Sequence, residues 1–309
     1  MKVLVSTENM SKQDWLQWRN KGIGGSDASI ICGINKYKSP VELWMEKTGM
    51  AGPVEAGEAA YWGTMIEPLI RDEFTRRTGL RVSIEKSMFQ HPNYPFMLAN
   101  VDGIINDDTF GDCIFEAKTS SIYRQNEWDD SIPEEYQLQV QHYMAVTGLK
   151  GAYVAVLMGG NQYKYQFIPR DEELIQVLIR LESLFWQFVQ TKTPPPMDGS
   201  KSCSDFLSRF YPDSKPTSSI SLPEEALTLI KQYEEYEAKE KEVALIKEEA
   251  ANKLKNMLGD NESGLIIDRK ITWKTMSSER LDSKTLKLDH PEIYKNYTYK
   301  STFRRFSLK

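Results

Sequence analysis

The chain has 309 residues, of which 27% are charged and 40% are hydrophobic, and its formal net charge is −5. This is the composition of a globular protein, and no apolar run approaches the roughly 20 residues that span a membrane. The negative charge argues against a protein that coats nucleic acid nonspecifically, but it is compatible with an enzyme that has a local basic channel. The three scattered cysteines, the three histidines and the short polar N-terminus predict a reduced, cytoplasmic protein without a zinc site or a secretory signal.

The N-terminal segment predicts two helices and an anion site between them. Residues 11–20 begin with a serine suited to cap a helix and carry two tryptophans three positions apart. Gly24 and Gly25 then break the chain, and Ser26 is placed to cap a second helix. The free N–H groups at such a helix start favour an anion, and Arg19 can fold back onto it. The alternative is an ordinary capped helix after a turn.

Residues 62–78 carry apolar side chains at helical spacing, which predicts a third helix. Proline is tolerated in the first turn of a helix, so Pro68 predicts that the regular helix starts near Ile66, after a loop over residues 51–60. Glu67 then lies at the helix start. It is either a solvated acid or a third carboxylate aimed at the strands that follow.

Residues 96–120 predict a β-hairpin with several polar side chains. An apolar run ends in turn-forming residues, and a second short run leads into Glu116-Ala117-Lys118. Because successive side chains of a strand point to opposite faces, Glu116 and Lys118 share a face and Ala117 points away. Asp102, in the first run, can lie opposite them in an antiparallel pair.

Two acids and a lysine on one face of a hairpin are costly to bury. The arrangement becomes favourable if a divalent cation lies between the carboxylates and the ammonium group faces a phosphate. The alternative is a solvated hairpin edge, where charged residues are common.

The remaining pattern up to residue 190 alternates helices and strands. Residues 133–147 predict a helix with Gln139 at the polar margin of its apolar stripe, where a glutamine is usually only solvated. Strands are predicted over residues 152–157 and 162–169, and an amphipathic helix over residues 171–189. This order favours an α/β fold, with a mixed central β-sheet flanked by helices.

The last third of the chain differs in composition. Residues 193–222 are rich in proline, serine and lysine and resemble a linker. A long helix is predicted over residues 223–258, and its interrupted heptads favour packing on its own chain or on a short partner over a long coiled coil. A strand is predicted over residues 264–276. Basic and aromatic residues alternate in the final segment, which suits either DNA contact with base stacking or an amphipathic strand that covers the extension.

Four motifs occur in the order of one protein family. They are W-x3-R-x6-S ending at Ser26, G-x3-E ending at Glu67, D-x13-E-x-K ending at Lys118, and Q-V-Q-H-Y starting at Gln139. With them, residues 10–190 resemble the YqaJ-type viral recombinases, the branch of the PD-(D/E)xK nucleases that includes the phage lambda exonuclease.

The resemblance implies a particular domain organisation. A PD-(D/E)xK nuclease domain is expected over residues 1–192, followed by a linker-like segment over residues 193–222. Residues 223–309 are expected to form a C-terminal extension of a long helix and basic-aromatic strands. The extension has no counterpart in the shortest members of the family, so its role stays open.

The resemblance also implies roles for individual residues. Asp102 and Glu116 match metal-binding carboxylates, with the backbone carbonyl of Ala117 as a further ligand. The expected metal is Mg2+, with Mn2+ as the alternative. Lys118 matches the catalytic lysine that positions or deprotonates the attacking water. The other matches are Glu67, a helical glutamate near the metals, Gln139, a glutamine near the nucleophile, and Arg19 and Ser26, which hold a 5′-terminal phosphate.

Such a site implies a metal-dependent 5′-to-3′ exonuclease that acts on double-stranded DNA ends and leaves 3′ single-stranded tails during phage recombination. The family is known for homo-oligomers, namely toroidal trimers, and for a RecT-type single-strand annealing protein as partner. One alternative is an endonuclease of the same fold, of the repair or restriction type. The other is a noncatalytic DNA- or protein-interaction protein that works through its long helix and basic-aromatic tail.

Overall fold

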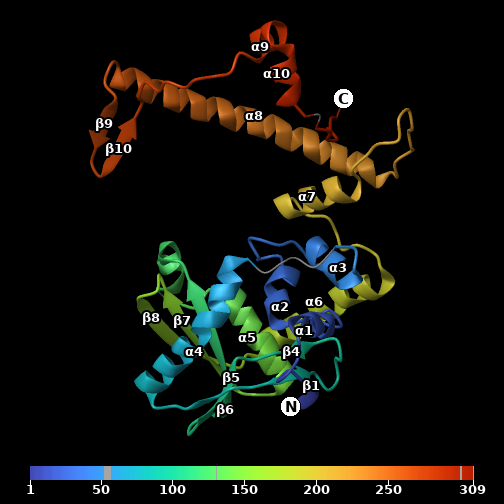
Figure 1. The fold of residues 1–309 in the computed structure, drawn as a ribbon, viewed down its shortest axis with the longest axis vertical. Helices are drawn as coiled ribbons and strands as arrows, with labels where there is room; N and C mark the ends of the chain where they lie inside the picture. Colours follow the sequence, from blue (N-terminus) through green and yellow to red (C-terminus); the bar gives the residue numbers. More distant parts are fainter. Residues whose placement is uncertain (52–56, 130, 300, 309) are drawn as a thin grey trace. The chain divides into compact units, whose positions relative to one another are not determined.

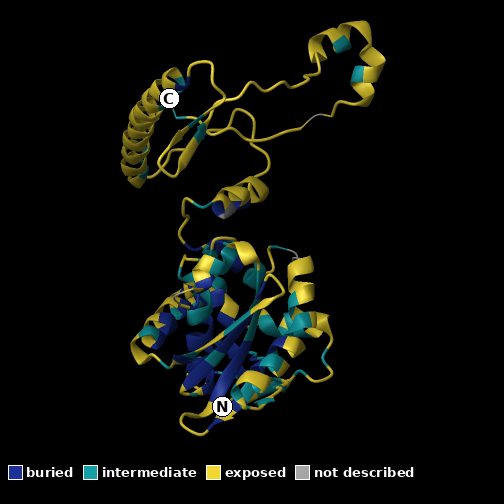
Figure 2. Cartoon of the chain, turned by 90° about the vertical axis from the view of Figure 1, so that its left-hand side faces the viewer, coloured by how far each residue is buried: buried dark blue, intermediate teal, exposed yellow. Residues whose placement is uncertain are grey.

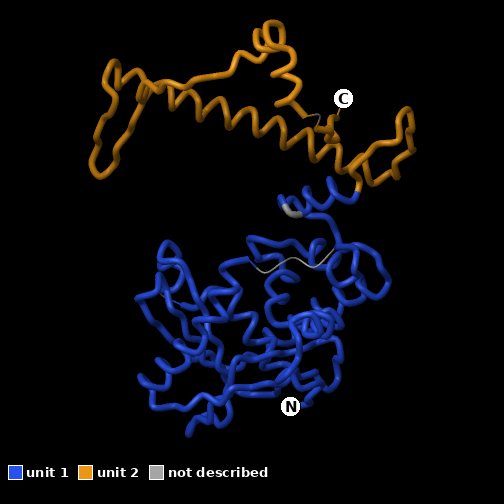
Figure 3. Tube along the Cα trace, in the orientation of Figure 1, with its two compact units in different colours: residues 1–210 blue, residues 211–309 orange. Residues whose placement is uncertain are grey.

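The computed structural model describes residues 1–51, 57–129, 131–299 and 301–308. The chain divides into two compact units, Met1–Phe210 and Tyr211–Lys309, which Figure 3 shows in different colours. Figure 2 shows that the buried residues lie mainly in the first unit, whereas most of the second is exposed. The candidate site residues all belong to the first unit.

The first unit is built on a five-stranded sheet in the order β2-β5-β6-β7-β8 (Figure 1). Its middle strand, β6 (Gly111–Ser120), pairs antiparallel with β5 (Gly103–Asp107) and parallel with β7 (Gly151–Met158). The outer strands β2 (Val82–Ser83) and β8 (Gln162–Pro169) run antiparallel to their neighbours. The prediction of a mixed central sheet is confirmed.

Helices cover both faces of this sheet. On one face α4 (Glu58–Thr78) packs Phe74 against Phe115 of β6, and burying such a side chain contributes about 1.5–3 kcal/mol. On the other face α5 (Glu134–Thr147) belongs to a core that includes residues of β6, β7 and α6 (Glu172–Thr191). The alternating strand pattern places Glu116 and Lys118 on the α5 face. This confirms an α/β fold in which helices flank the sheet.

A second sheet has the order β1-β3-β4 and is antiparallel. The apolar run over residues 96–105, expected to be one strand, is divided between the two sheets. Its first part contains β4 and its second part contains the start of β5, and three residues separate the two strands. This departure leaves Asp102 between two strands, so its side chain is free to reach the neighbouring β6. The strands of this sheet are β1 (Lys2–Ser6), β3 (Ser87–Gln90) and β4 (Leu98–Ala99).

The N-terminal helices form largely as their caps predict. Ser11 accepts a hydrogen bond from the backbone N–H of Asp14, and Ser39 accepts one from Glu42. Proline occupies the first turn of the third helix, where its missing N–H is harmless. These helices are α1 (Lys12–Arg19), α2 (Gly25–Ile31) and α3 (Pro40–Thr48).

Helix α4 starts at Glu58, well before the predicted start near Ile66, and Pro68 lies inside it. The missing hydrogen bond at Pro68 is offset by tertiary packing, because Ile70 and Phe74 are fully buried on the sheet. Of the loop expected over residues 51–60, residues 52–56 lie outside the described part of the chain.

The linker-like segment contains a helix that the sequence reading did not predict. Helix α7 (Lys201–Phe210) buries Cys203 and Phe206 in a core cluster with Trp44 of α3. The first compact unit therefore extends to Phe210. The proline-rich composition of this segment indicated a linker, but a short amphipathic helix forms because its apolar face packs on a distant part of the chain.

The second unit is dominated by the predicted long helix α8 (Glu225–Leu258). The strand predicted over residues 264–276 is a hairpin of β9 (Ser263–Ile266) and β10 (Arg269–Thr272). The expected basic-aromatic strands are wrong: within residues 273–299 and 301–308, the regular elements are helices α9 (Ser283–Asp289) and α10 (Pro291–Asn296). An alternating pattern forms a strand only where another strand pairs with its backbone. Among the described helices, none is both long and apolar enough to cross a membrane.

Candidate active site

The hairpin of β5 and β6 brings the two predicted acids to the same place. Gly103 pairs with Phe115, so Asp102 lies one residue beyond the ladder and on the level of Glu116. Oδ2 of Asp102 accepts a hydrogen bond from the backbone N–H of Ala117 at 2.8 Å. This bond holds the carboxylate of Asp102 against β6, as the hairpin pattern predicted.

Lys118, Glu116 and Gln139 form a closed set of hydrogen bonds. Nζ of Lys118 donates to Oε1 of Glu116 at 2.6 Å and to Oε1 of Gln139 at 3.0 Å. Nε2 of Gln139 donates to the same oxygen of Glu116 at 2.7 Å and to the hydroxyl of Tyr143 at 3.0 Å. Gln139 is 6% exposed, so it is not the solvated residue that its position on the helix indicated. The orientation of the lysine is therefore fixed from two sides.

Negative charge at this site exceeds what the lysine can balance. Burial and the charge of Asp102 raise the pKa of Glu116 to about 8, although Lys118 opposes the shift. Burial also raises the pKa of Asp102 above its ordinary value. Burial alone would lower the pKa of Lys118, but the two acids outweigh it and raise that pKa. Lys118 therefore stays charged. A charged lysine suits the stabilisation of a phosphate and does not suit the role of a general base.

Glu67 approaches the same acids from α4. Burial and the charge of Asp102 raise the pKa of Glu67 to about 7, while Arg71 and Lys118 oppose the shift. Its Oε1 accepts a hydrogen bond from Arg71 at 3.4 Å, one helical turn along α4. Glu67 thus interacts electrostatically with the other two carboxylates, but its hydrogen bond is to Arg71 of its own helix.

The acids fit a hard cation. Oε2 of Glu116 is buried and lacks a hydrogen-bond partner among the described residues, which is costly for a carboxylate. In the same residues, no group of three or more His, Cys, Asp or Glu side chains could hold a metal ion. An ion at this place would be held by Asp102 and Glu116, and the family resemblance implies the carbonyl of Ala117 as a further ligand. Mg2+ prefers oxygen ligands and usually keeps several waters, so it fits such a donor set.

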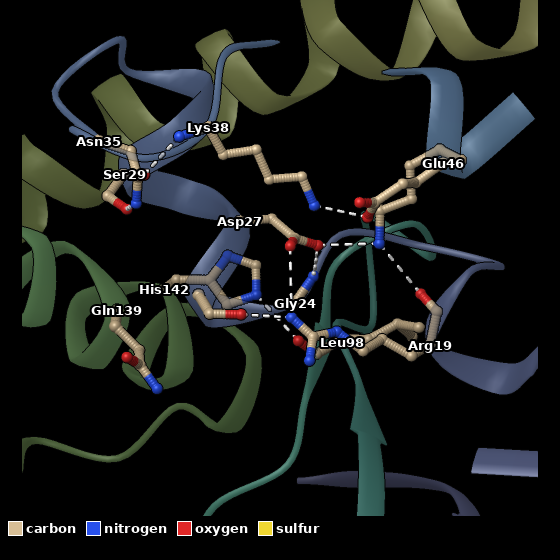
Figure 4. A network of polar contacts seen from close by, with 12 residues as sticks. Arg19, Gly24, Asp27, Ser29, Asn35, Lys38, Glu46, Leu98, Gln139 and His142 are labelled. Carbon is tan, nitrogen blue, oxygen red and sulfur yellow. Dashed lines mark hydrogen bonds and ion pairs between the residues drawn. The ribbon is translucent and has the colours of Figure 1, made fainter. Parts of the chain in front are cut away.

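Arg19 and Ser26, expected to hold a terminal phosphate, lie together. Nη2 of Arg19 donates to Oγ of Ser26 and lies 3.3 Å from Oδ1 of Asp27. Gly24 rather than Ser26 caps α2, because the carboxylate of Asp27 reaches back and accepts its N–H at 3.0 Å (Figure 4). The N–H of Gly24, one of the donors at this helix start, is therefore already bonded. The candidate anion contact includes the side chains of Arg19 and Ser26.

Two residues that the motifs did not single out support Arg19. Nζ of Lys47 lies 2.8 Å from Oδ2 of Asp27 and donates to the backbone carbonyl of Arg19 at 3.2 Å. The side chains of Asp27 and Lys47 are both almost completely buried. An acid three residues after Gly24 is a signal for a helix start that could have identified Asp27. No local signal marks Lys47, because α3 meets α2 only in the folded chain.

One residue beside Arg19 and one beside Lys118, namely Ser26 and Gln139, line a common cavity. A Cβ atom added to Gly25 would lie 2.5 Å from Cε1 of Tyr143, so glycine is required for α2 to approach α5. The hydroxyl of Tyr143 in turn accepts the hydrogen bond from Gln139. Ser26 and Gln139 line the same cavity of about 130 Å³. Residues more than 100 positions apart in the chain thus face one space.

His142 fixes the helix that carries Gln139. Its Nδ1 is hydrogen-bonded to Oε1 of Glu182 at 2.8 Å. Its Nε2 donates to the carbonyl of Leu98 at 2.9 Å, as Figure 4 shows. All three elements, α5, α6 and β4, are joined through this fully buried imidazole. The position of Gln139 is therefore set by core contacts as well as by its own hydrogen bonds.

The fold and the site together define an α/β protein whose central hairpin brings two carboxylates and a lysine together. A model of the YqaJ-like viral recombinase domain matches residues 14–150. The uncharacterized protein YqaJ of Bacillus subtilis (strain 168) is 40% identical over 312 residues, which cover 99% of this chain and 97% of that protein. The chain belongs to the YqaJ-like viral recombinase family.

Other similarities are more distant. The uncharacterized protein R354 of Acanthamoeba polyphaga mimivirus is 26% identical over 158 residues, which cover 48% of this chain and 28% of that protein. The crystal structure of an alkaline exonuclease (LHK-Exo) from Laribacter hongkongensis has 20% identity and a TM-score of 0.48, covering 65% of this chain and 98% of that one. A phage-related exonuclease from Haemophilus somnus 129PT has 14% identity and a TM-score of 0.45, covering 57% and 97%.

Proposed function

We propose that this protein is a metal-dependent deoxyribonuclease that degrades double-stranded DNA from 5′ ends and leaves 3′ single-stranded tails for recombination. The observation that carries the proposal is the arrangement of Lys118, Glu116 and Gln139 around one buried oxygen, with Asp102 beside them. A fixed ammonium group next to acids that fit a divalent cation is suited to phosphodiester hydrolysis.

The side chains have separate tasks in this proposal. Lys118 keeps a positive charge against the negative charge that develops on the phosphate. Gln139 holds Lys118 and Glu116 in position, so little reorganisation is needed when DNA arrives. Mg2+, or Mn2+ in its place, would supply Lewis-acid stabilisation and activation of water when held by Asp102, Glu116, the carbonyl of Ala117 and, less directly, Glu67.

Preference for a 5′-phosphorylated end is proposed to come from Arg19 and Ser26. The side chain of Arg19 is 32% exposed, and one nitrogen of its guanidinium is bonded to Ser26 and Asp27. A guanidinium with spare N–H groups beside a hydroxyl suits the oxygens of a terminal phosphate. Because Ser26 shares a cavity with Gln139, a phosphate held there would lie close to the cleavage chemistry.

We also propose, from the family, that the protein acts as a homo-oligomer, a trimeric ring, and delivers its product to a RecT-type single-strand annealing protein. Light scattering of the full chain tests the ring directly. A mass of three chains supports it, and a stable monomer at micromolar concentration contradicts it.

The function is tested by incubating the full chain with 5′-phosphorylated linear duplex DNA and covalently closed circles, with Mg2+ or with EDTA. The expected result is loss of the linear strand from its 5′ end, intact circles, and no reaction in EDTA. Cleavage of the circles would favour the endonuclease alternative. DNA that stays intact under all conditions would favour the noncatalytic one.

A further inference from the structure

The loop between α2 and α3 presents a lysine and a tyrosine at the candidate active site. Lys36 and Tyr37 line the same cavity of about 130 Å³ as Ser26 and Gln139. Tyr37 is 75% exposed and the side chain of Lys36 is 67% exposed. A large aromatic ring left in water at the rim of a catalytic hollow is a candidate contact for a ligand.

Asn35 fixes the backbone of the loop that carries Lys36 and Tyr37. Its Oδ1 accepts hydrogen bonds from the backbone N–H groups of Tyr37 at 2.9 Å and Lys38 at 3.0 Å. Its Nδ2 donates to Oγ of Ser29 at 3.2 Å, and its backbone N–H donates to the Ser29 carbonyl at 3.2 Å. Figure 4 shows Asn35 beside Ser29 at the start of this loop. The loop backbone is therefore tied to α2, which reduces the backbone ordering cost when Lys36 and Tyr37 bind a ligand.

Cations line the cavity from both sides and are bonded to carboxylates, one of which, Glu135, also lines the cavity and accepts a hydrogen bond from Nη2 of Arg124 at 2.8 Å. Across from the loop, Arg124 belongs to the 3₁₀ helix η1 (Ile122–Trp128) and lines the same cavity. Nε of Arg124 donates to Oε2 of Glu127 at 3.0 Å, while Nζ of Lys36 lies 3.4 Å from Oε1 of that residue. Glu127 thus joins the two sides as an anion bound between two cations. Its exposed ion pair with Lys36 is weak and replaceable by another anion.

We propose that Tyr37, Lys36 and Arg124 form a contact surface for a nucleic acid strand next to the catalytic groups. In this arrangement the Tyr37 ring stacks on a base, and the two cations bind the strand's phosphates in place of Glu127. Exposed rings interleaved with cations are the chemistry of single-strand binding, and the shared cavity leads to Gln139. This proposal rests on the proposed nuclease function, because the strand that this surface binds would be the DNA that is cleaved beside it.

The stacking part is tested by binding of a fluorescently labelled single-stranded oligonucleotide to the full chain in EDTA. Tyr37→Ala is expected to weaken binding about tenfold, because one stacked base is lost. Tyr37→Phe keeps the ring and is expected to bind as wild type. Thermal unfolding of each variant confirms that the exposed position has not disturbed the fold. Equal affinity of Tyr37→Ala and wild type would overturn the stacking role.

The electrostatic part is tested by the salt dependence of the same binding. Lys36→Ala is expected to reduce the slope of log K against log salt by about 0.7, the value for one phosphate contact on a single strand. Lys86→Ala is the matched control, because Lys86 is also an exposed lysine in an ion pair, with Glu8, and it lies next to the β1-β3-β4 sheet rather than in the cavity lining. Glu127→Gln is expected to bind severalfold more tightly, since the competing anion is gone. Unchanged slopes and affinities in both loop and Glu127 variants would overturn the proposal.

The outcomes separate this surface from the nuclease function itself. If wild type cleaves linear DNA but Tyr37→Ala and Lys36→Ala bind like wild type, the surface is wrong and the nuclease stands. If wild type binds the strand through these residues but cleaves nothing, the surface stands and the nuclease is wrong.

Discussion

Lys47 contacts both ends of Arg19, directly at the backbone carbonyl and indirectly at the guanidinium through Asp27. The carbonyl of Arg19 belongs to the last residue of α1 and accepts hydrogen bonds from Lys47 and, at 3.4 Å, from the backbone N–H of Gly22. Lys47 has 2% of its side chain exposed, so water contributes little to its solvation. The carboxylate of Asp27 is therefore what makes this buried ammonium group tolerable.

The first prediction concerns stability. Asp27→Asn keeps the shape of the side chain but leaves the charge of Lys47 without its partner, and we expect a loss of about 3–5 kcal/mol in the free energy of unfolding. Urea unfolding measures it. The double variant Asp27→Asn with Lys47→Met should recover much of the loss, since the almost fully buried charge of Lys47 is then removed together with its partner. A single variant as stable as wild type would contradict the pairing.

The second prediction is a pH dependence of that stability. Burial raises the pKa of Asp27, but the charges of Lys47 and Arg19 and the N–H of Gly24 outweigh it and hold the pKa well below its ordinary value. A carboxyl group whose pKa is lower in the folded state than in the unfolded state adds to the free energy of unfolding. This contribution is fully present above the ordinary pKa of aspartate, about 3.9, and is lost as the pH falls below that value. The difference in unfolding free energy between wild type and Asp27→Asn should therefore shrink below about pH 4. A difference that stays constant from pH 6 to pH 3 would exclude this linkage.

The third prediction concerns the lysine of the hairpin. Lys118→Ala should lose cleavage by about 10³-fold or more while DNA binding in EDTA is retained, because the missing charge matters most at the reacting phosphate. Rates on linear duplex DNA and binding by anisotropy measure the two effects. Lys164→Ala, at a half-exposed lysine of β8, is the control and should cleave normally. Full activity of Lys118→Ala would remove this residue from the chemistry.

The fourth prediction concerns the choice of DNA end. Arg19→Ala should bring the ratio of cleavage rates on 5′-phosphorylated and 5′-hydroxyl ends to about one, because the guanidinium that favours the phosphate is gone. The ratio is independent of how much protein is folded, so it separates end recognition from stability. Arg76→Ala, at a highly exposed arginine of α4, should keep the wild-type ratio. If wild type itself makes no distinction between the ends, Arg19 has no such role.

Local patterns failed where a distant partner decided the structure. The run over residues 96–105 has one continuous apolar pattern, yet β4 and β5 pair in different sheets because different neighbours compete for their backbones. Gln139 was predicted to be solvated because it lies at the polar margin of α5. It is buried because β6 brings Glu116 and Lys118 against that margin. A helix periodicity shows which face is polar, but not what lies opposite.

The sequence by itself determined the hairpin that aligns Asp102 with Glu116, the shared face of Glu116 and Lys118, and the α/β order of the elements, because strand alternation and helix periodicity are local properties of the chain. Only the tertiary structure decided that Gln139 joins the lysine, that Gly25 lets α2 press against Tyr143, and that Lys47 secures Asp27 and Arg19. These contacts connect segments far apart in sequence. Burial, which makes each of them strong, exists only after the segments have packed together.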